Sequence, residues 1–305
     1  MPSLRARLVN LALPLLGIRR FFSQPEKLDE RIAALREKPS IRPRRALYEE
    51  FAITEDASHG YPVVTIAPKG GVQPGKPHLF YLHGGGYVMD IAAVHWDSIA
   101  RLCRDLGASA TVPLYPLAPE HKADEILAAM RALYGELVQP HAASEITIMG
   151  DSAGGGMSLA LAQMLRADGG PMPASLVLFS PWVDATATAP GQKAIERRDR
   201  MLAVSGLKAC GEMYRGALAV DDPKVSPLFG PLENLPPMAI FSGTSDILLV
   251  DGQRLDRRLR ELGSTTHVYR KYDGMFHVWM LLPVPEGTKA LGEAADFIRT
   301  HNGRT

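Results

Sequence analysis

Residues 146–155 read Ile-Thr-Ile-Met-Gly-Asp-Ser-Ala-Gly-Gly, and this stretch decides the fold. Its first four residues form a short apolar run typical of a buried strand, and the Met-, Leu- and Ala-rich residues 153–167 are typical of a helix. Between them lies the pattern Gly-x-Ser-x-Gly, in which Gly150 and Gly154 permit a tight turn and a close approach of neighbouring backbone. The pattern predicts that Ser152 presents its hydroxyl at the end of a strand, as a candidate nucleophile.

On both sides of this turn, short and nearly continuous apolar runs alternate with amphipathic segments at helical spacing. This alternation predicts an α/β fold whose mostly parallel sheet is covered by helices on both faces. The expected strands are residues 46–54, 62–67, 78–82, 108–114, 146–149, 175–179, 238–242 and 266–272. The expected helices are residues 95–106, 121–138, 153–167, 248–262 and 289–300.

Two segments depart from this alternation. Residues 1–45 are helical in pattern, and residues 185–222 form a polar, basic stretch that is followed by a short helical pattern. We expect residues 1–45 to be an N-terminal helical cap arm and residues 185–222 to be a cap insertion. Both would lie above the carboxyl edge of the sheet, where ligands bind in such folds. The α/β core would then consist of residues 46–184 and 223–305.

Composition limits the location and the partners of the protein. The formal charge of +1 gives no overall field that would attract nucleic acid, so we expect no nucleic-acid partner. The two cysteines are far apart, which argues against a disulfide framework and predicts a reducing, cytoplasmic location. Residues 8–18 are apolar but too short to span a bilayer. We expect them to form a packing helix, with membrane-surface contact or a cleaved export signal as the alternatives.

A nucleophilic serine needs a base and an acid that orients the base. His277 follows the last expected strand, and Asp246 follows the strand before it, so both side chains would emerge at the same edge as Ser152. This order of serine, acid and histidine is the one that doubly wound hydrolases use. We therefore predict Ser152, Asp246 and His277 as a catalytic triad.

The same chemistry needs hydrogen-bond donors for an oxyanion. Residues 83–87 read His-Gly-Gly-Gly-Tyr and follow the expected strand 78–82. Because glycines expose their N–H groups, Gly84 and Gly85 are candidate donors, together with the N–H of Ala153 after the nucleophile. No metal motif such as His-Glu-x-x-His is present, which argues against a metal hydrolase, so we predict no metal site.

Several other residues have both a structural and a functional interpretation. We expect Glu120 to be a buried hydrogen-bonding brace, and the basic run 197–200 to be a solvated surface of the cap. Asp151 is interpreted as a scaffold carboxylate that lies beside the substrate pocket. The remaining pocket candidates are Tyr87, Met201 and Leu202, although a core role for the two cap residues is equally consistent with the sequence.

Together these motifs resemble the bacterial hormone-sensitive-lipase-like esterases, also called lipolytic family IV. The matching segments are residues 83–87, 115–120, 150–155, 180–184, 222–228, 243–248 and 274–278. The resemblance implies an α/β-hydrolase fold with a mostly parallel eight-stranded sheet, flanking helices and a helical cap. It also implies ester hydrolysis through an acyl-enzyme and no cofactor. Since related esterases are often dimers, a homodimer is one assembly to test.

The chain departs from the family pattern at three positions outside the triad. Asp90 stands where the family often has glycine, and would either change the turn of this loop or place a carboxylate near the acyl pocket. Pro116 replaces a common arginine, so any ion pair of that arginine is absent. Met157 stands where asparagine is frequent.

Three functions follow, in decreasing order of support. The first is a serine carboxylesterase that acts on a small-molecule ester with a short-to-medium acyl chain. The second is an amidase or deacetylase that acts on a small acylated molecule with the same residues. The third is a non-catalytic ligand receptor on the same scaffold, which the presence of His277 disfavours.

Overall fold

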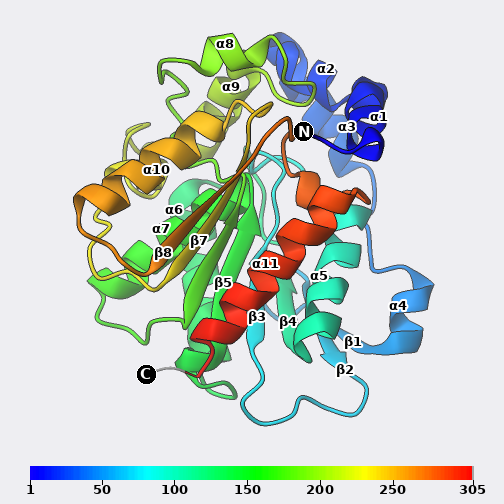
Figure 1. The fold of residues 1–305 in the computed structure, drawn as a ribbon, viewed down its shortest axis with the longest axis vertical. Helices are drawn as coiled ribbons and strands as arrows, with labels where there is room; N and C mark the ends of the chain where they lie inside the picture. The colour runs from blue at the N-terminus through cyan, green and yellow to red at the C-terminus, as the bar shows by residue number, and fades with distance from the viewer. Residues whose placement is uncertain (304–305) are drawn as a thin grey trace.

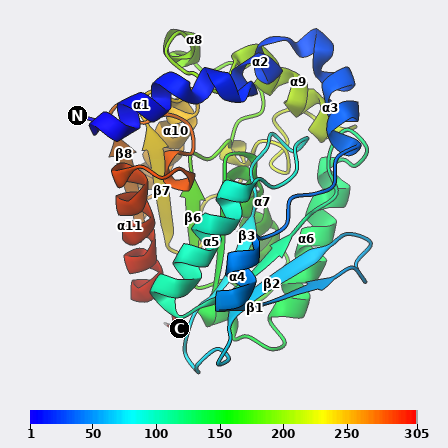
Figure 2. The ribbon, with the colours of Figure 1, turned by 90° about the vertical axis from the view of Figure 1, so that its right-hand side faces the viewer.

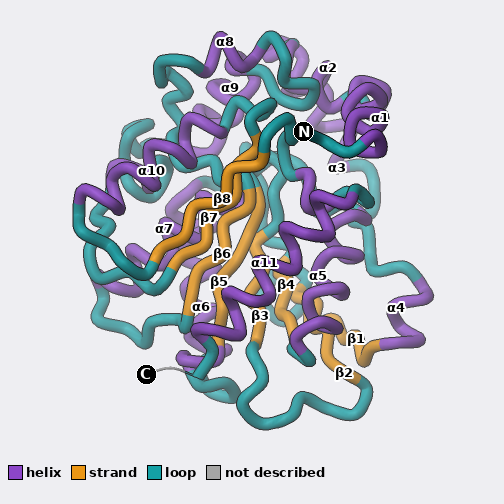
Figure 3. The backbone as a smooth tube through the Cα atoms, viewed as in Figure 1, coloured by secondary structure: helices purple, strands orange, loops and turns teal. Residues whose placement is uncertain are grey.

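The computed structural model describes residues 1–303 and has one central sheet (Figures 1 and 3). Its eight strands are β1 (Phe51–Asp56), β2 (Val63–Pro68), β3 (His78–Leu82), β4 (Ser109–Pro113), β5 (Ile146–Asp151), β6 (Ser175–Phe179), β7 (Met238–Gly243) and β8 (His267–Tyr272). Their order is β1-β2-β4-β3-β5-β6-β7-β8. β2 runs antiparallel to both β1 and β4, and all other neighbours are parallel. The predicted α/β fold with a mostly parallel eight-stranded sheet is confirmed.

Helices cover both faces of the sheet (Figure 2). α5 (Ala93–Leu106) and α11 (Pro285–His301) pack together on one face, and α6 (Ala123–Leu137) and α7 (Ala153–Ala167) pack together on the other. α10 (Leu249–Glu261) packs against β7 and β8. Strands β3 to β7 are buried along their whole length, which explains why their sequences read as continuous apolar runs.

Most expected elements are present, but the first strand is shorter than predicted. Residues 46–50 belong to α4 (Arg45–Glu50), and β1 begins only at Phe51. Leu47 is the buried residue of this short helix, which packs against β1. The last helix begins at Pro285, four residues before the expected start, because proline is well suited to the first position of a helix.

The parallel strands end at one edge of the sheet, and both unusual segments lie across that edge (Figures 1 and 2). The N-terminal segment contains α1 (Leu4–Ala12), η1 (Leu13–Leu16), α2 (Ile18–Ser23), η2 (Pro25–Lys27) and α3 (Leu28–Arg36). The insertion contains α8 (Gln192–Glu196) and α9 (Val204–Arg215). Short 3₁₀ turns complete the chain: η3 (Ala143–Glu145), η4 (Pro227–Phe229) and η5 (Trp279–Leu281). None of the helices within residues 1–303 has the length and apolar character needed to cross a membrane.

The two segments pack directly on each other through α2 and α9. Gly206 lies in α9 against the backbone of Phe22, and a Cβ atom at Gly206 would lie 2.2 Å from the Phe22 carbonyl oxygen. Phe22 also lies under the glycine run, since its ring is 3.4 Å from the position of a Cβ on Gly86. The absence of a side chain at residue 206 therefore lets the arm, the insertion and the glycine run meet.

We predict that Gly206→Ala lowers the free energy of unfolding by about 1–3 kcal/mol, because the added methyl group overpacks the contact with Phe22. Gly292→Ala is the matched control: it also lies inside a helix, but a Cβ there meets no atom within 4 Å. Alanine should raise stability at this control position by roughly 0.5–1 kcal/mol. Urea unfolding of the two variants measures the difference. Equal shifts in both would contradict the close contact at residue 206.

Candidate active site

Ser152 sits on the sharp turn between β5 and α7, as the Gly-x-Ser-x-Gly pattern predicts. Its backbone has φ 52° and ψ −121°, a strained conformation for a residue with a side chain. Three backbone hydrogen bonds hold it: the Ser152 N–H donates to the Phe179 carbonyl at 2.8 Å, and the Ser152 carbonyl accepts from the Trp182 N–H at 2.9 Å and from the Gly156 N–H at 3.1 Å. The turn is thus fixed from the end of β6 and the residues that follow it.

Gly154 brings this turn against the end of β3. A Cβ atom at Gly154 would lie only 1.9 Å from the Leu82 carbonyl oxygen, so no larger residue fits without a backbone shift. This approach places the turn beside the glycine run 84–86, which follows β3. The turn and the glycine run are therefore neighbours because of a backbone contact.

The Asp151 carboxylate joins the same two segments. Its Oδ1 accepts hydrogen bonds from the Tyr81 hydroxyl at 2.8 Å and from the Gly84 N–H at 3.0 Å, and its Oδ2 lies 3.4 Å from His95 Nε2. Burial alone raises the pKa of Asp151, but His95 and these donors outweigh it and hold that pKa below its usual value. Asp151 is thus an ionised, buried group that holds the glycine run, as the scaffold interpretation expected.

The expectation that Gly84 donates to an oxyanion is wrong in this structure, because its N–H is already bonded to Asp151. Among the described residues, no group accepts a hydrogen bond from the Gly85 or Gly86 N–H. Ala153 is the first residue of α7, so its N–H has no partner within that helix. The free donors beside Ser152 are therefore those of Gly85, Gly86 and Ala153, and Gly86 is an addition to the predicted set.

His277 and Asp246 lie in hydrogen-bond contact, with His277 Nδ1 2.9 Å from Asp246 Oδ2. Both side chains are buried, and the other Asp246 oxygen accepts from the Leu248 N–H at 2.9 Å. Burial lowers the pKa of His277, but the Asp246 carboxylate outweighs it through its charge and its hydrogen bond, so the pKa is raised above 6.5. The contact fixes the imidazole and favours its protonated form.

Ser152 and His277 line one cavity of about 380 Å³. Its walls are mainly apolar and come from the N-terminal arm, the insertion and the loop after β8. Asp151, Met201 and Leu202 also line it, and Asp90 places a carboxylate in its wall. The other apolar lining residues include Leu16, Ile18, Phe22, Met89, Leu281 and Leu282.

Tyr87 is not among the described residues that line this cavity, contrary to expectation. Its ring is buried and stacks on the ring of Tyr214 in α9, with centroids 3.6 Å apart and an interplanar angle of 5°. It also lies near Trp182, at a centroid distance of 5.4 Å. Tyr87 therefore supports the insertion on the core, a role that a sequence pattern around the glycine run cannot distinguish from pocket lining.

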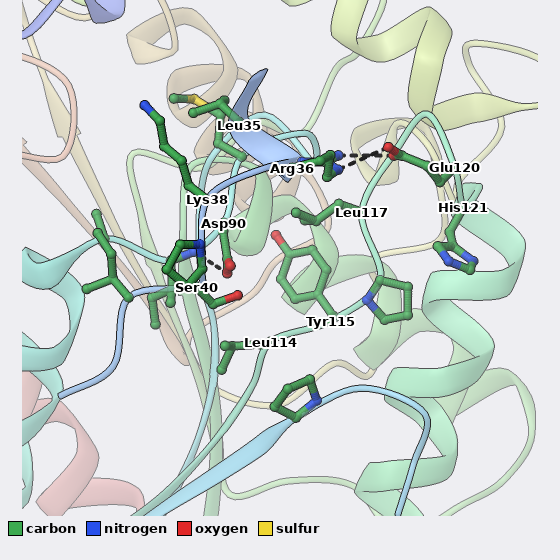
Figure 4. A pocket seen from close by; sticks show the side chains of 17 residues that line it. Leu35, Arg36, Lys38, Ser40, Asp90, Leu114, Tyr115, Leu117, Glu120 and His121 are labelled. Carbon is green, nitrogen blue, oxygen red and sulfur yellow. Dashed lines mark hydrogen bonds and ion pairs between the residues drawn. The ribbon is translucent and has the colours of Figure 1, made fainter. Parts of the chain in front are cut away.

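A second cavity of about 570 Å³ adjoins the first and shares Met89, Asp90 and Ala92 with it (Figure 4). It contains neither Ser152 nor His277. Arg36 pairs with Glu120 at its rim, with Nε 3.0 Å from Oε1, and the Glu120 side chain is 48% exposed. Glu120 is thus a hydrogen-bonded brace, but the expectation that it is buried is wrong. Its arginine partner comes from the N-terminal arm.

Asp199 is another residue whose surroundings differ from the sequence-based expectation. It belongs to the run 197–200 that was expected to be solvated, yet its side chain is buried. Oδ1 accepts hydrogen bonds from the N–H groups of Met201 and Leu202, each at 2.8 Å, and Oδ2 accepts from the Ile247 N–H at 2.8 Å. One sequence signal could have identified it. Asp199 precedes the apolar residues Met201 and Leu202 by two and three positions, and an aspartate at this spacing often accepts hydrogen bonds from the N–H groups that follow it.

Asp199 therefore connects the cavity wall to the loop that carries Asp246. Burial and the nearby Asp246 carboxylate raise the pKa of Asp199 to about 6, so Asp199 is largely ionised at neutral pH. Its charge in turn adds to the effect of Asp246 in raising the pKa of His277. Neither the motifs nor the order of the strands indicated this third charged group.

The chain matches the α/β hydrolase fold family over residues 79–281. It is 31% identical to an acetyl-hydrolase of Streptomyces hygroscopicus over 86% of this chain and 91% of that protein. It is 32% identical to an esterase of Acinetobacter venetianus, over 72% and 73% of the two chains. A triacylglycerol lipase of Mycobacterium tuberculosis is 34% identical over 62% of this chain, but the match spans only 38% of that lipase.

Solved structures show the same relationship. A crystal structure of EstE5, soaked with p-nitrophenyl butyrate, has a TM-score of 0.80 and 31% sequence identity over 91% of this chain and 92% of that one. An esterase from the bacterial hormone-sensitive lipase family has a TM-score of 0.78 and 29% identity, over 89% of each chain.

We predict that Asp199→Asn lowers kcat/KM for a soluble ester by about tenfold. The three N–H groups that now donate to the two carboxylate oxygens would face an amide, whose NH₂ group cannot accept a hydrogen bond. At least one N–H group would lose its partner, and the cavity wall and the Asp246 loop would be held less firmly. Removal of the charge should also lower the pKa of His277 and shift the rising limb of the kcat/KM profile to lower pH. The pH dependence of kcat/KM measures both effects.

Glu212→Gln is the matched control, since it removes a carboxylate of the insertion that is 56% exposed and pairs with Arg215. This variant should keep both the rate and the pH profile of the parent. An unchanged pH profile in Asp199→Asn would show that Asp199 has a structural role alone.

Proposed function

Because the chain belongs to the hormone-sensitive-lipase-like esterases of the α/β-hydrolase fold and is a carboxylic ester hydrolase, we propose that it cleaves short-to-medium acyl esters with Ser152, His277 and Asp246. One observation carries the proposal: Ser152 and His277 line a single cavity, and His277 Nδ1 is 2.9 Å from an Asp246 carboxylate oxygen. This leaves His277 Nε2 as the ring nitrogen that serves Ser152.

In the first half of the reaction, Ser152 Oγ attacks the ester carbonyl carbon while its proton passes to His277 Nε2. The carbonyl oxygen becomes an oxyanion, which the N–H groups of Gly85, Gly86 and Ala153 stabilise. When the tetrahedral intermediate collapses, the bond to the alcohol oxygen breaks and His277 gives the proton to the leaving alcohol. The product on the enzyme is an acyl ester of Ser152.

In the second half, a water molecule attacks the acyl carbon and gives its proton to His277. Collapse of the second intermediate returns that proton to Ser152 Oγ and releases the carboxylic acid. Asp246 keeps the imidazole in one tautomer and stabilises its charged form in both halves. Every proton and the acyl group pass between the substrate, water, Ser152 and His277, so the reaction requires no cofactor.

The cavity supports a small substrate. Its volume of about 380 Å³ lies at the lower end of the range for small-ligand sites, and its lining is mainly apolar. Phe22 closes it from the arm, and Met201 and Leu202 close it from the insertion. A short-to-medium acyl chain fits this space, whereas a long chain needs either the adjoining 570 Å³ cavity or an opening toward solvent.

Hydrolysis of an amide or an acetyl group on a small molecule is the alternative, and the similarity to an acetyl-hydrolase over most of both chains favours it. The nucleophile, base and oxyanion donors would be the same, because the leaving group alone differs. Rates on matched pairs of acetyl esters and acetyl amides decide between the two. A kcat/KM that is higher for the amides would replace the esterase assignment.

We predict that Ser152→Ala lowers kcat on p-nitrophenyl butyrate by about 10⁴-fold or more, because the acyl-enzyme cannot form. Labelling by a fluorophosphonate probe should be lost in the same variant. Ser205→Ala is the matched control, since Ser205 is an exposed serine of the insertion and should be dispensable. A Ser152→Ala enzyme with the parent rate would overturn the proposal.

We predict that kcat/KM increases with pH and that the midpoint of this increase lies above pH 6.5. His277 must be neutral to accept the proton, and the pKa of His277 is raised. Asp246→Asn should lower this midpoint, since the carboxylate that favours the protonated imidazole is gone. The same change should reduce kcat by roughly 10⁴-fold, because the imidazole loses its preferred tautomer. A midpoint that stays in place in this variant would contradict the assigned pair.

A further inference from the structure

An exposed row of leucines follows one face of the N-terminal segment. Leu4, Leu8, Leu11 and Leu15 recur at helical spacing, and with Leu16 they form a set that we call the leucine row. Their exposed fractions are 73%, 58%, 64%, 88% and 61% in sequence order. Of the ten large apolar side chains that are exposed in the described chain, six belong to residues 1–16. Such a concentration marks an interaction surface.

Packing within the protein does not explain the leucine row, because the opposite face of the same segment makes the internal contacts. Ala6 and Leu13 are each 1% exposed and belong to the core. Ser3 fixes the start of α1: its N–H and its hydroxyl donate to the two oxygens of Glu286 in α11, at 2.5 and 2.9 Å. The segment is thus held in place while its leucines face outward.

The charged side chains within the segment that carries the leucine row have one sign. Residues 1–25 contain four arginines, Arg5, Arg7, Arg19 and Arg20, and no aspartate or glutamate, although the whole chain carries only +1. Arg5, Arg7 and Arg20 are exposed. Apolar side chains flanked by arginines match the chemistry of an anionic phospholipid surface, where leucines enter the acyl boundary and arginines meet the headgroups.

The leucine row is continuous with the cavity that contains Ser152. Leu16 is 61% exposed and also lines this cavity, next to Ile18 and Phe22 from the following helix. A surface that covers the leucine row would therefore lie at the entrance of the cavity. An ester in that surface could reach Ser152 without crossing bulk water.

From these observations we infer that the leucine row and its arginines dock the protein on an anionic lipid surface and feed lipid esters to the cavity. The inference rests on the proposed function, because it takes the Ser152 cavity as the site of hydrolysis. It assigns the substrate class as acyl esters that reside in a lipid phase. A second copy of the chain is the competing occupant of the same surface, and the experiments below distinguish the two.

The first test is cosedimentation with vesicles of phosphatidylcholine, with and without phosphatidylglycerol. The parent protein should bind the vesicles that contain phosphatidylglycerol, and added salt should weaken this binding. Leu8→Ser and Leu15→Ser should each reduce the partition coefficient by about tenfold. Arg5→Gln and Arg7→Gln should each reduce it by roughly fivefold on the anionic vesicles, with little change on the neutral ones.

The matched control is Leu262→Ser, which removes a 45% exposed leucine at the end of α10, away from the N-terminal segment (Figure 1). It should bind vesicles like the parent. Neither Leu8 nor Leu15 lines the cavity, so both variants should hydrolyse p-nitrophenyl butyrate in solution at the parent rate. On an ester embedded in anionic vesicles, the two variants should lose rate in proportion to their loss of binding.

Equal vesicle binding by the parent and the leucine variants, or no binding by the parent, would overturn the inference. A dimer of the parent that dissociates in Leu8→Ser, without vesicle binding, would assign the leucine row to self-association instead. Ser152→Ala separates the two proposals, because it should bind vesicles normally. Binding without hydrolysis by the parent would refute the proposed function alone, and hydrolysis without binding would refute the docking surface alone.

Discussion

The close approach of the Ser152 turn to the end of β3 is the contact on which the rest of the site depends. Gly154 has no side chain, so its backbone can lie against the Leu82 carbonyl, and Asp151 then reaches the Gly84 N–H across the same gap. This contact sets the positions of the donors that surround Ser152. The remaining parts of the site are supplied by loops that leave the same edge of the sheet.

The sequence predicted the fold and the three residues Ser152, Asp246 and His277 because both depend on local patterns. Fully buried strands such as β5 and β7 read as apolar runs. Ser152 directly follows β5, while Asp246 and His277 lie in the loops after β7 and β8, at the edge where the parallel strands end. The sheet and the family relationship are confirmed. The roles of the three residues remain predictions, to which the structure adds the contact of His277 with Asp246.

The errors have a common cause, which is that partners distant in the sequence decide the burial and the hydrogen bonds of a side chain. Asp199 was assigned to the surface because arginines surround it, but three N–H groups from two loops hold it inside. Gly84 was assigned as a free donor because its partner lies 67 residues away. Tyr87 packs against Tyr214, and Arg36 from the N-terminal arm pairs with Glu120. Apart from the N–H groups of Met201 and Leu202, which closely follow Asp199, these partners lie far away in the sequence, and no local pattern encodes contacts with them.

The burial of Asp199 beside Asp246 has a consequence for the pH range in which the protein can work. A carboxyl whose pKa rises from 3.8 to about 6 on folding binds its proton more tightly in the folded state. Its contribution to stability therefore falls as pH rises through this window. Hydrolysis needs neutral His277 and thus a higher pH. At the pH at which His277 is neutral, Asp199 is ionised, and this ionisation destabilises the folded state. The two neighbouring carboxylates of Asp199 and Asp246 therefore create a trade-off between stability and activity.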